Sequence, residues 1–187
     1  MNKDQVFRMH LPAAKEDLSA LRAGMRVLLS GVLYTARDAA HLRLIAALEK
    51  GEVLPINLDG QAIYYVGPTP AQDGQPIGAC GPTTSYRMDP MTPKLLEKGL
   101  KVMIGKGERT EEVIAAMKAH GAVYLAATGG AGALLSSRVK KRTPVAYADL
   151  GAEAITQLEV EDFPVVVVID TQGNSAYEIE RQKYRRK

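Results

Sequence analysis

The segment from Gly81 to Asp89 concentrates side chains that can do chemistry. It reads Gly-Pro-Thr-Thr-Ser-Tyr-Arg-Met-Asp, so nine residues carry three aliphatic hydroxyls, a guanidinium and a carboxylate. The Gly-Pro opening predicts a turn or loop rather than the interior of a helix. Two further polar segments, residues 35–41 and 104–107, also lie where apolar runs end. Open α/β folds place their ligand-binding groups at the ends of strands, so we expect the three segments to meet.

Three cations stand in these segments: Arg37, Arg87 and Lys106. Each lies near Gly, Thr or Ser at the end of an element rather than on the polar stripe of a helix. Arg binds a carboxylate through two parallel N–H bonds, and Lys adds a compact point charge. Together with the hydroxyls of Thr83 and Thr84, they predict a cationic pocket for a small substrate with two carboxylates.

The elements that must position these residues alternate between strand and helix along much of the chain, which predicts an α/β fold. We expect strands at residues 6–11, 25–34, 62–66, 101–104, 122–127 and 163–170. We expect helices at residues 15–22, 35–50, 92–99 and 110–121, and from about residue 133. The first two strands are less clearly joined by helical crossovers, which leaves a mixed sheet or a barrel open.

The second of these helices bears on the pocket directly. Thr35 is predicted as its N-cap, with Asp38 as an acidic capping-box partner. Arg37 then lies in the first turn, where free N–H groups and the helix dipole favour anions. His41 falls on the buried face of this helix, and we expect it to be a hydrogen-bonded packing residue.

Size and charge narrow the class of protein. We expect residues 1–187 to form one domain, and no apolar run approaches the roughly 18 residues of a membrane helix. The first residues lack a signal-peptide pattern, so we expect a cytoplasmic protein. Five of the positive charges lie in residues 181–187. We interpret this tail as a solvated basic end, with a docking arm for an acidic partner as the alternative, and expect no nucleic-acid partner.

Several cofactor classes do not match the sequence. Cys80 is the only cysteine, so the chain forms no internal disulfide and cannot by itself hold an iron–sulfur cubane. The three histidines lack metal-ligand spacing, which argues against zinc. The Gly-rich turn at residues 128–132 departs from the dinucleotide fingerprint and predicts tight packing of a strand against a helix.

Four segments together resemble a known family, the class I fumarate hydratases. They are residues 35–41 (Thr-Ala-Arg-Asp-Ala-Ala-His), 81–89, 105–107 (Gly-Lys-Gly) and 127–131 (Ala-Thr-Gly-Gly-Ala), in the order found in the C-terminal part of that family. In some organisms this part is a separate β subunit, and the L(+)-tartrate dehydratase β subunit is similar to it as well. The resemblance extends roughly from residue 6 to residue 173.

The resemblance implies a swivelling β/β/α domain with a mixed sheet and flanking helices. It implies a partner α subunit whose cysteines hold a [4Fe–4S] cluster, an active site formed between the chains, and an α2β2 heterotetramer or a dimer of β chains. The implied reaction is the reversible hydration of fumarate to (S)-malate. Arg37, Arg87 and Lys106 match positions that bind substrate carboxylates, and Thr83 matches the proposed base for the C3 proton of malate.

Two other functions stay open. The first is the β subunit of L(+)-tartrate dehydratase, although the Ala-Arg-Asp-Ala-Ala-His helix start and the Ser85-Tyr86 pair lean toward fumarase. The second is a regulatory module that binds a dicarboxylate without catalysis. A binder needs the cations but has no need of the Thr83 hydroxyl, so the combined set of Thr83, Arg87 and Lys106 favours an enzyme.

Overall fold

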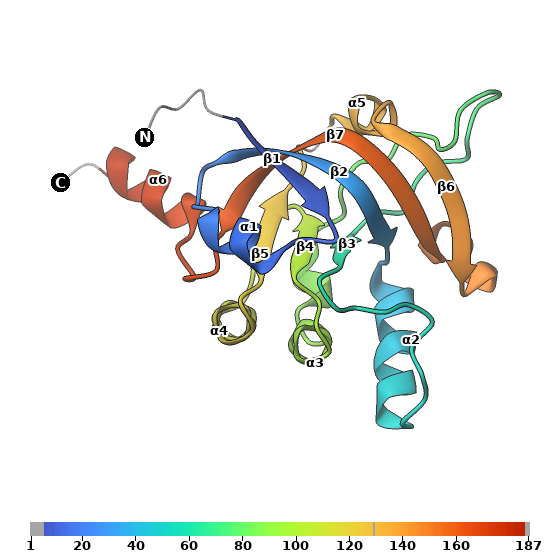
Figure 1. The fold of residues 1–187 in the computed structure, drawn as a ribbon, viewed down its shortest axis with the longest axis horizontal. Helices are drawn as coiled ribbons and strands as arrows, with labels where there is room; N and C mark the ends of the chain where they lie inside the picture. The colour runs from blue at the N-terminus through green and yellow to red at the C-terminus, as the bar shows by residue number, and fades with distance from the viewer. Residues whose placement is uncertain (1–5, 129, 186–187) are drawn as a thin grey trace.

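One mixed sheet of seven strands forms the centre of the molecule, with helices against it (Figure 1). The structure, a computed structural model, describes residues 6–128 and 130–185. The strands are β1 (Val6–Leu11), β2 (Arg26–Thr35), β3 (Ala62–Tyr64), β4 (Val102–Gly105), β5 (Val123–Ala126), β6 (Val139–Ala146) and β7 (Ile155–Ile169). The helices are α1 (Lys15–Ala20), α2 (Asp38–Glu49), α3 (Thr92–Glu97), α4 (Glu111–His120), α5 (Gly132–Ser136) and α6 (Ala176–Tyr184), with 3-10 turns η1 (Ser85–Met88) and η2 (Ala148–Glu153). The predicted α/β class with a mixed sheet and flanking helices is confirmed.

The sheet closes on itself. Strands β2, β3, β4 and β5 pair in parallel, and β7 pairs antiparallel with both β5 and β2. The β2–β7 ladder extends from Arg26 opposite Val166 to Thr35 opposite Thr156, along the whole of β2. A register shift between Leu29 and Gly31 interrupts this ladder, and Gly31 has a φ of 108°. The carboxyl ends of β2, β3 and β4 therefore share one rim of the closed sheet.

Successive side chains of the parallel strands point to opposite faces of the sheet, so they belong to two separate hydrophobic cores. One set of side chains from β3, β4 and β5 joins the core enclosed by the strands: Ala62, Tyr64, Val102, Ile104, Val123 and Leu125. The intervening residues Ile63, Met103 and Tyr124 lie in a second core with residues of α2, α3 and α4. These three helices lie on one side of the sheet in Figure 1. Both faces of the parallel strands are thus covered, which fixes their register.

The predicted capping of α2 is wrong. Thr35 is the last residue of β2, and its hydroxyl contacts the Ala154 carbonyl at 3.2 Å and the Thr156 hydroxyl at 2.8 Å. The N-cap position belongs to Arg37, whose side chain makes no capping bond. Glu153 caps the helix from a distance, because its carboxylate accepts a 2.9 Å hydrogen bond from the Ala39 N–H.

Three elements of the second half differ from expectation. Strand β7 begins at Ile155 rather than at residue 163, and neither β6 nor α6 was predicted. Among the described strands, β6 pairs with β7 alone, and most of its residues are exposed, so it carries no run of apolar residues to mark it. Part of the basic tail lies in α6, where Arg181 contacts Glu108, while residues 186–187 are outside the described ranges.

Helices α1 and α3 end about two residues before the predicted ends at residues 22 and 99. The C-cap of α1 is Leu21, and the Thr92 hydroxyl at the start of α3 donates to the Met88 carbonyl. No helix in the described ranges is long and apolar enough to cross a membrane.

Candidate active site

Four of the five predicted site residues line one pocket. The pocket has a volume of about 330 Å³ and lies beyond the carboxyl end of β4. Its lining residues are Pro82, Thr83, Thr84, Tyr86, Arg87 and Lys106. Thr83 and Thr84 therefore face the same space as the Lys106 loop, which follows about twenty residues later in the sequence.

Backbone hydrogen bonds hold the two sides of this pocket together. The Thr83 N–H donates to the Tyr65 carbonyl at 2.7 Å, which attaches the segment to the chain after β3. The Lys106 N–H donates to the Thr83 carbonyl at 3.3 Å, and the Ser85 N–H donates to the Lys106 carbonyl at 2.9 Å. Thr84 and Lys106 are thus paired like residues of two parallel strands, which fixes the positions of their backbones.

The polar ends of Thr83 and Lys106 remain free to meet a ligand. Neither the Thr83 hydroxyl nor the Lys106 ammonium has a hydrogen-bond or ion-pair partner in the described part of the chain. An unpaired ammonium beside two hydroxyls attracts an anion, because Lys supplies three N–H donors and a full positive charge.

Ser85 and Asp89 belong to the same segment but point away from the pocket. Ser85 is buried, and its hydroxyl lies 2.8 Å from the Tyr124 hydroxyl, which in turn donates to the Gly107 carbonyl at 3.1 Å. Asp89 is also buried, and its carboxylate accepts from the Arg109 guanidinium. These two side chains therefore support the loop that carries Lys106 rather than contact a ligand.

Arg37 lies beside the pocket rather than in its lining. Its Nη2 is 3.5 Å from Glu153 Oε1, and its Nε is 3.7 Å from Asp38 Oδ2. The other oxygen of Asp38 is 3.2 Å from Arg87 Nε. Asp38 therefore connects Arg37 to the pocket through Arg87.

Sequence reasoning missed the roles of Asp38 and Glu153. The sequence pattern predicts a capping role for Asp38, although its place directly after the candidate Arg37 is a signal for an ion pair at the site. Glu153 gave no signal, because it is 114 residues from the Ala39 N–H that it binds.

His41 is a packing residue, as predicted. It is fully buried on α2, its Nδ1 lies 2.9 Å from the Arg37 carbonyl, and its ring packs edge-on against Tyr65. Burial, aided by the nearby positive charge of Arg109, lowers the pKa of His41 to about 4, against the opposing effects of the Arg37 hydrogen bond and the Asp38 charge. The imidazole is therefore neutral at physiological pH and adds no charge to the site.

The residues of this chain do not fit an iron–sulfur cluster. Cubane clusters need several thiolate ligands, and Cys80 is the only cysteine of the sequence. Cys80 is buried near the Gly132 carbonyl, and burial raises the pKa of its thiol to about 12. Among the described residues, no group of three His, Cys, Asp or Glu side chains is placed to hold a metal ion.

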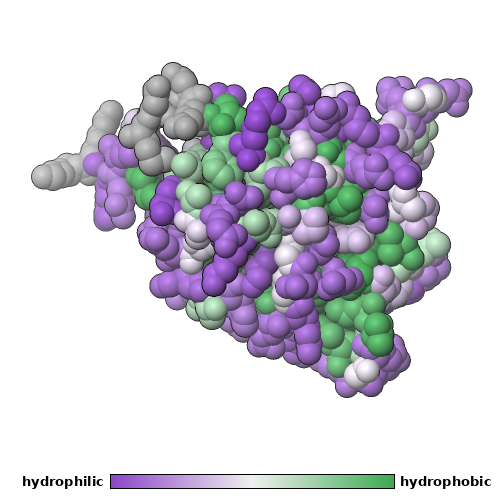
Figure 2. Space-filling model, viewed as in Figure 1, coloured by the Kyte–Doolittle hydropathy of each residue, from purple (hydrophilic) through white to green (hydrophobic). Residues whose placement is uncertain are grey.

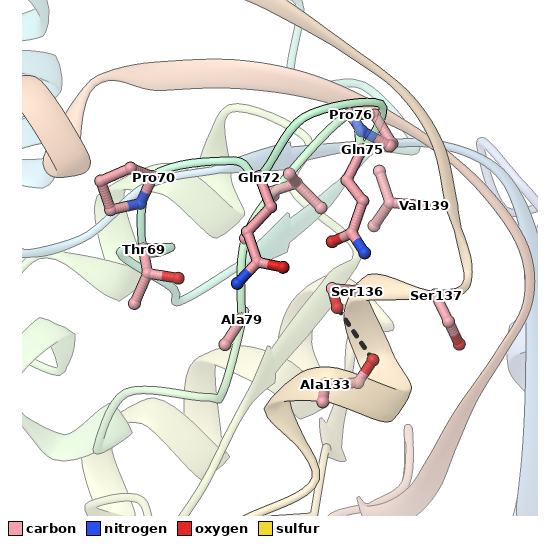
Figure 3. A pocket seen from close by; sticks show the side chains of 12 residues that line it. Thr69, Pro70, Gln72, Gln75, Pro76, Ala79, Ala133, Ser136, Ser137 and Val139 are labelled. Atoms are coloured by element: carbon pink, nitrogen blue, oxygen red, sulfur yellow. Dashed lines mark hydrogen bonds between the residues drawn. The ribbon is translucent and has the colours of Figure 1, made fainter.

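A second hollow of about 390 Å³ lies between the 69–79 loop and α5 (Figure 3). Gln72 and Gln75 approach it from the loop, and Ser136 approaches it from α5, where its hydroxyl donates to the Ala133 carbonyl. None of the described residues that line this hollow carries a charge, so it does not suit a dicarboxylate.

The outer face shown in Figure 2 is mainly hydrophilic, with hydrophobic side chains gathered at the lower right, over the region of α2. Leu42 of α2 and Val53 just after it are exposed apolar residues of this part of the chain. A further groove lies between α6 and β7, lined in part by Val166, Tyr177 and Tyr184. The cationic pocket at the carboxyl end of β4 therefore stays the candidate for the chemistry.

Known proteins match this chain along most of its length. The family model described as Fumarase C-terminus matches residues 1–180. Fumarate hydratase 2 of Leishmania major is 39% identical over 165 residues, which cover 87% of this chain and 29% of that protein. The aerobic class I fumarate hydratase of Escherichia coli (strain K12) is 38% identical over 163 residues, which cover 86% of this chain and 30% of that protein.

A shorter relative matches nearly end to end. The putative L(+)-tartrate dehydratase subunit beta of Methanocaldococcus jannaschii is 40% identical over 170 residues, which cover 88% of this chain and 87% of that subunit. The chain thus spans about three-tenths of the fumarate hydratases it matches and most of a separate dehydratase subunit. By these matches, the chain belongs to the fumarase C-terminus family.

Proposed function

We propose that this chain is the β subunit of a heteromeric hydro-lyase that hydrates fumarate reversibly to (S)-malate. The observation that carries the proposal is the common pocket of Thr83, Arg87 and Lys106 in a chain whose relatives include class I fumarate hydratases. The putative L(+)-tartrate dehydratase subunit beta that the chain matches over most of its length is named as a β subunit, which supports this assignment.

The charges of the pocket suit part of a dicarboxylate site. Arg37 and Arg87 are partly neutralised by Asp38 and Glu153, and Lys106 has no carboxylate partner among the described residues. The described side chains thus leave about one positive charge uncompensated, whereas fumarate and malate each bring two negative charges. This imbalance supports a site that another polypeptide completes, and we assign that part, together with the [4Fe–4S] cluster, to a partner α subunit.

We assign Arg87, Lys106 and Arg37 to the carboxylates of the substrate, and the Thr84 hydroxyl to a supporting hydrogen bond. Bidentate N–H bonds from Arg fix the plane of a carboxylate, and Lys adds a point charge. When a proton leaves C3 of malate, negative charge grows on the neighbouring carboxylate. Cations held in place before the reaction stabilise that charge without reorganisation.

We assign the removal of the C3 proton to the Thr83 hydroxyl oxygen. An aliphatic hydroxyl is a weak base, so it needs neighbouring positive charge that stabilises its alkoxide. Arg87 and Lys106 line the same pocket as Thr83 and are placed to supply this charge. Thr83 accepts the C3 proton as its alkoxide, so its hydroxyl must first give its own proton to solvent or to a group of the partner subunit, because no described residue accepts it.

The near-complete match to a tartrate dehydratase subunit favours L(+)-tartrate as a second candidate substrate. Both reactions eliminate water from a four-carbon dicarboxylate, so the same pocket serves either one. The extra hydroxyl of tartrate requires an additional hydrogen-bond partner, which the partner chain would provide in part.

The decisive assay is anaerobic turnover of fumarate and of L-tartrate by this chain with and without its co-purified partner. Turnover of fumarate only in the complex supports the proposal, and turnover of tartrate alone changes the substrate. We expect Thr83→Ala to lower kcat by roughly 100-fold or more, and Thr143→Ala, on the exposed strand β6, to leave it unchanged. Binding of a dicarboxylate without turnover in the loaded complex would show a binding module instead.

If Thr83→Ala keeps most of its turnover while Arg87→Ala loses it, Thr83 only positions the substrate. Thr83→Ser separates the two roles further, because it retains the hydroxyl and removes the methyl group. We expect Thr83→Ser to keep a large part of the wild-type kcat.

A further inference from the structure

The carboxylate of Asp38 lies between two arginines of the candidate site. Its Oδ1 is 3.2 Å from Arg87 Nε, and its Oδ2 is 3.7 Å from Arg37 Nε. Asp38 is the first residue of α2, whereas Arg87 belongs to η1, nearly fifty residues later. One carboxylate therefore fixes the spacing between two cations that different elements supply.

On the side away from Asp38, the Arg37 guanidinium is enclosed by Glu153 and Gly67. Glu153 faces its Nη2 at 3.5 Å, and the other oxygen of Glu153 is anchored by the Ala39 N–H. A Cβ atom at Gly67 would lie 2.7 Å from Arg37 Nη1, so this glycine leaves only the space that the guanidinium needs. Arg37 is thus held between Asp38, Glu153 and the backbone at Gly67.

Asp38 contacts both guanidinium groups through Nε. A guanidinium can bind a carboxylate in a bidentate manner through its two Nη atoms as well as through its Nε edge. The Nη atoms of Arg87 have no partner among the described residues, and this residue lines the pocket. The contact with Asp38 therefore orients Arg87 while leaving the edge that a substrate carboxylate would use.

The position of Asp38 argues against a role in stability alone. The side chains of Asp38 and Arg87 are 31% and 40% exposed, and ion pairs at such positions contribute little to folding. Asp38 Oδ2 and Arg37 Nε are inaccessible to solvent, yet neither forms a hydrogen bond in the described structure. Buried polar atoms without a hydrogen bond are costly even when opposite charges face each other, so the contact between Asp38 and Arg37 adds little to the stability of the free chain.

We propose that Asp38 is a positioning residue that couples Arg37 to Arg87 and presents both to a substrate carboxylate. This inference rests on the proposed function of the pocket as a dicarboxylate site. It also predicts the direction in which KM changes when Asp38 loses its charge. A negative charge beside the pocket repels a dianion, so loss of the charge alone would lower KM, whereas loss of positioning raises it.

The test is steady-state kinetics of the assembled enzyme with fumarate, using Asp38→Asn, which keeps the shape of the side chain and removes its charge. We expect KM to rise about tenfold while kcat changes less than about threefold. Asp38→Glu, which restores the charge, should recover part of the affinity. The matched control is Asp149→Asn. It removes an exposed carboxylate of η2 that pairs with Arg43 of α2, and it should leave KM unchanged.

A double-mutant cycle with Arg87→Ala decides whether Asp38 acts through Arg87. We expect the effect of Asp38→Asn on KM to shrink in the Arg87→Ala background, where Arg37 is the one arginine left for Asp38 to position. A lower or unchanged KM in Asp38→Asn, or an effect fully additive with that of Arg87→Ala, would overturn the inference.

Wild-type enzyme that turns over neither fumarate, malate nor tartrate would refute the proposed function instead. The inference about Asp38 can then be tested by NMR of the ¹⁵N-labelled full chain, through the Arg87 Nε–H resonance. A shift of this resonance in Asp38→Asn but not in Asp149→Asn supports the coupling. An Arg87 resonance identical in wild type and Asp38→Asn rules it out.

Discussion

Asp89 and Arg109 form a buried ion pair directly behind the candidate active site. Arg109 Nε donates to Asp89 Oδ1 at 2.7 Å, and the two side chains are 0% and 4% exposed. Arg109 Nη2 also donates to the Thr92 hydroxyl at 2.8 Å, and Asp89 Oδ2 accepts from the Thr110 N–H at 2.7 Å. The pair therefore joins the segment that carries Arg87 to the start of α4, just after the Lys106 loop.

Removal of one partner of this pair should be strongly destabilising. Asp89→Asn leaves the Arg109 charge uncompensated in the core, which typically costs about 3–5 kcal/mol. Urea denaturation followed by circular dichroism measures the loss. Asp149→Asn, which breaks the exposed pair with Arg43, should leave the unfolding midpoint unchanged. A loss below about 1 kcal/mol in Asp89→Asn would show that the pair is not the link between these elements.

Gly105 should tolerate no side chain. A Cβ atom there would lie 2.0 Å from Ser85 Oγ and 2.9 Å from the Tyr65 ring. We expect Gly105→Ala to reduce the free energy of unfolding by roughly 1–3 kcal/mol through overpacking and to displace the Lys106 loop.

Adding Ser85→Gly to Gly105→Ala should restore part of the stability, because it removes the nearer of the two clashes. Gly81→Ala is the matched control, since its Cβ atom would meet only Gly132 Cα at 4.0 Å. If Gly105→Ala is as stable as Gly81→Ala by thermal denaturation, Ser85 does not lie close enough to Gly105 to exclude a side chain there.

Gly67→Ala should separate activity from stability. The new methyl group would lie 2.7 Å from Arg37 Nη1, at the flexible end of a long side chain. We expect the guanidinium to move while the fold stays intact, so kcat/KM for fumarate should fall by up to roughly 100-fold with little change in Tm.

The control for Gly67→Ala is the same substitution in an Arg37→Ala background. There the methyl group has no guanidinium to displace, so it should cause no further loss of kcat/KM. A similar loss in both backgrounds would show that Gly67 acts independently of Arg37.

His41 should make the stability of the fold depend on pH. Its pKa is about 4 in the folded chain and near 6.5 when unfolded, so the unfolded state binds the proton more readily. Its contribution is complete above pH 6.5 and is lost as the pH falls from 6.5 toward 4, to a total of roughly 3 kcal/mol. Urea titrations at several pH values should show this loss in wild type.

His41→Asn should flatten that part of the pH profile, because its amide is neutral and can still donate to the Arg37 carbonyl. An unchanged slope in His41→Asn would assign the pH dependence to other groups.

The sequence by itself determined which residues could do chemistry and which elements carry them. Parallel strands buried on both faces leave continuous apolar runs, and the helices after them end at glycines such as Gly51 and Gly121. These local patterns located Arg37, Thr83, Thr84, Arg87 and Lys106 at the ends of elements, and four of the five line one pocket.

Only the tertiary structure decided how these residues are held. The edge strand β6 and the closure of β7 onto β2 depend on pairing between distant segments, which leaves no local periodicity. Glu153 replaces Thr35 as the cap of α2 because the closed sheet brings η2 to the start of that helix. Asp38 acquires two arginine neighbours for the same reason: sequence spacing gives the contacts within a helix, whereas contacts between elements follow from packing.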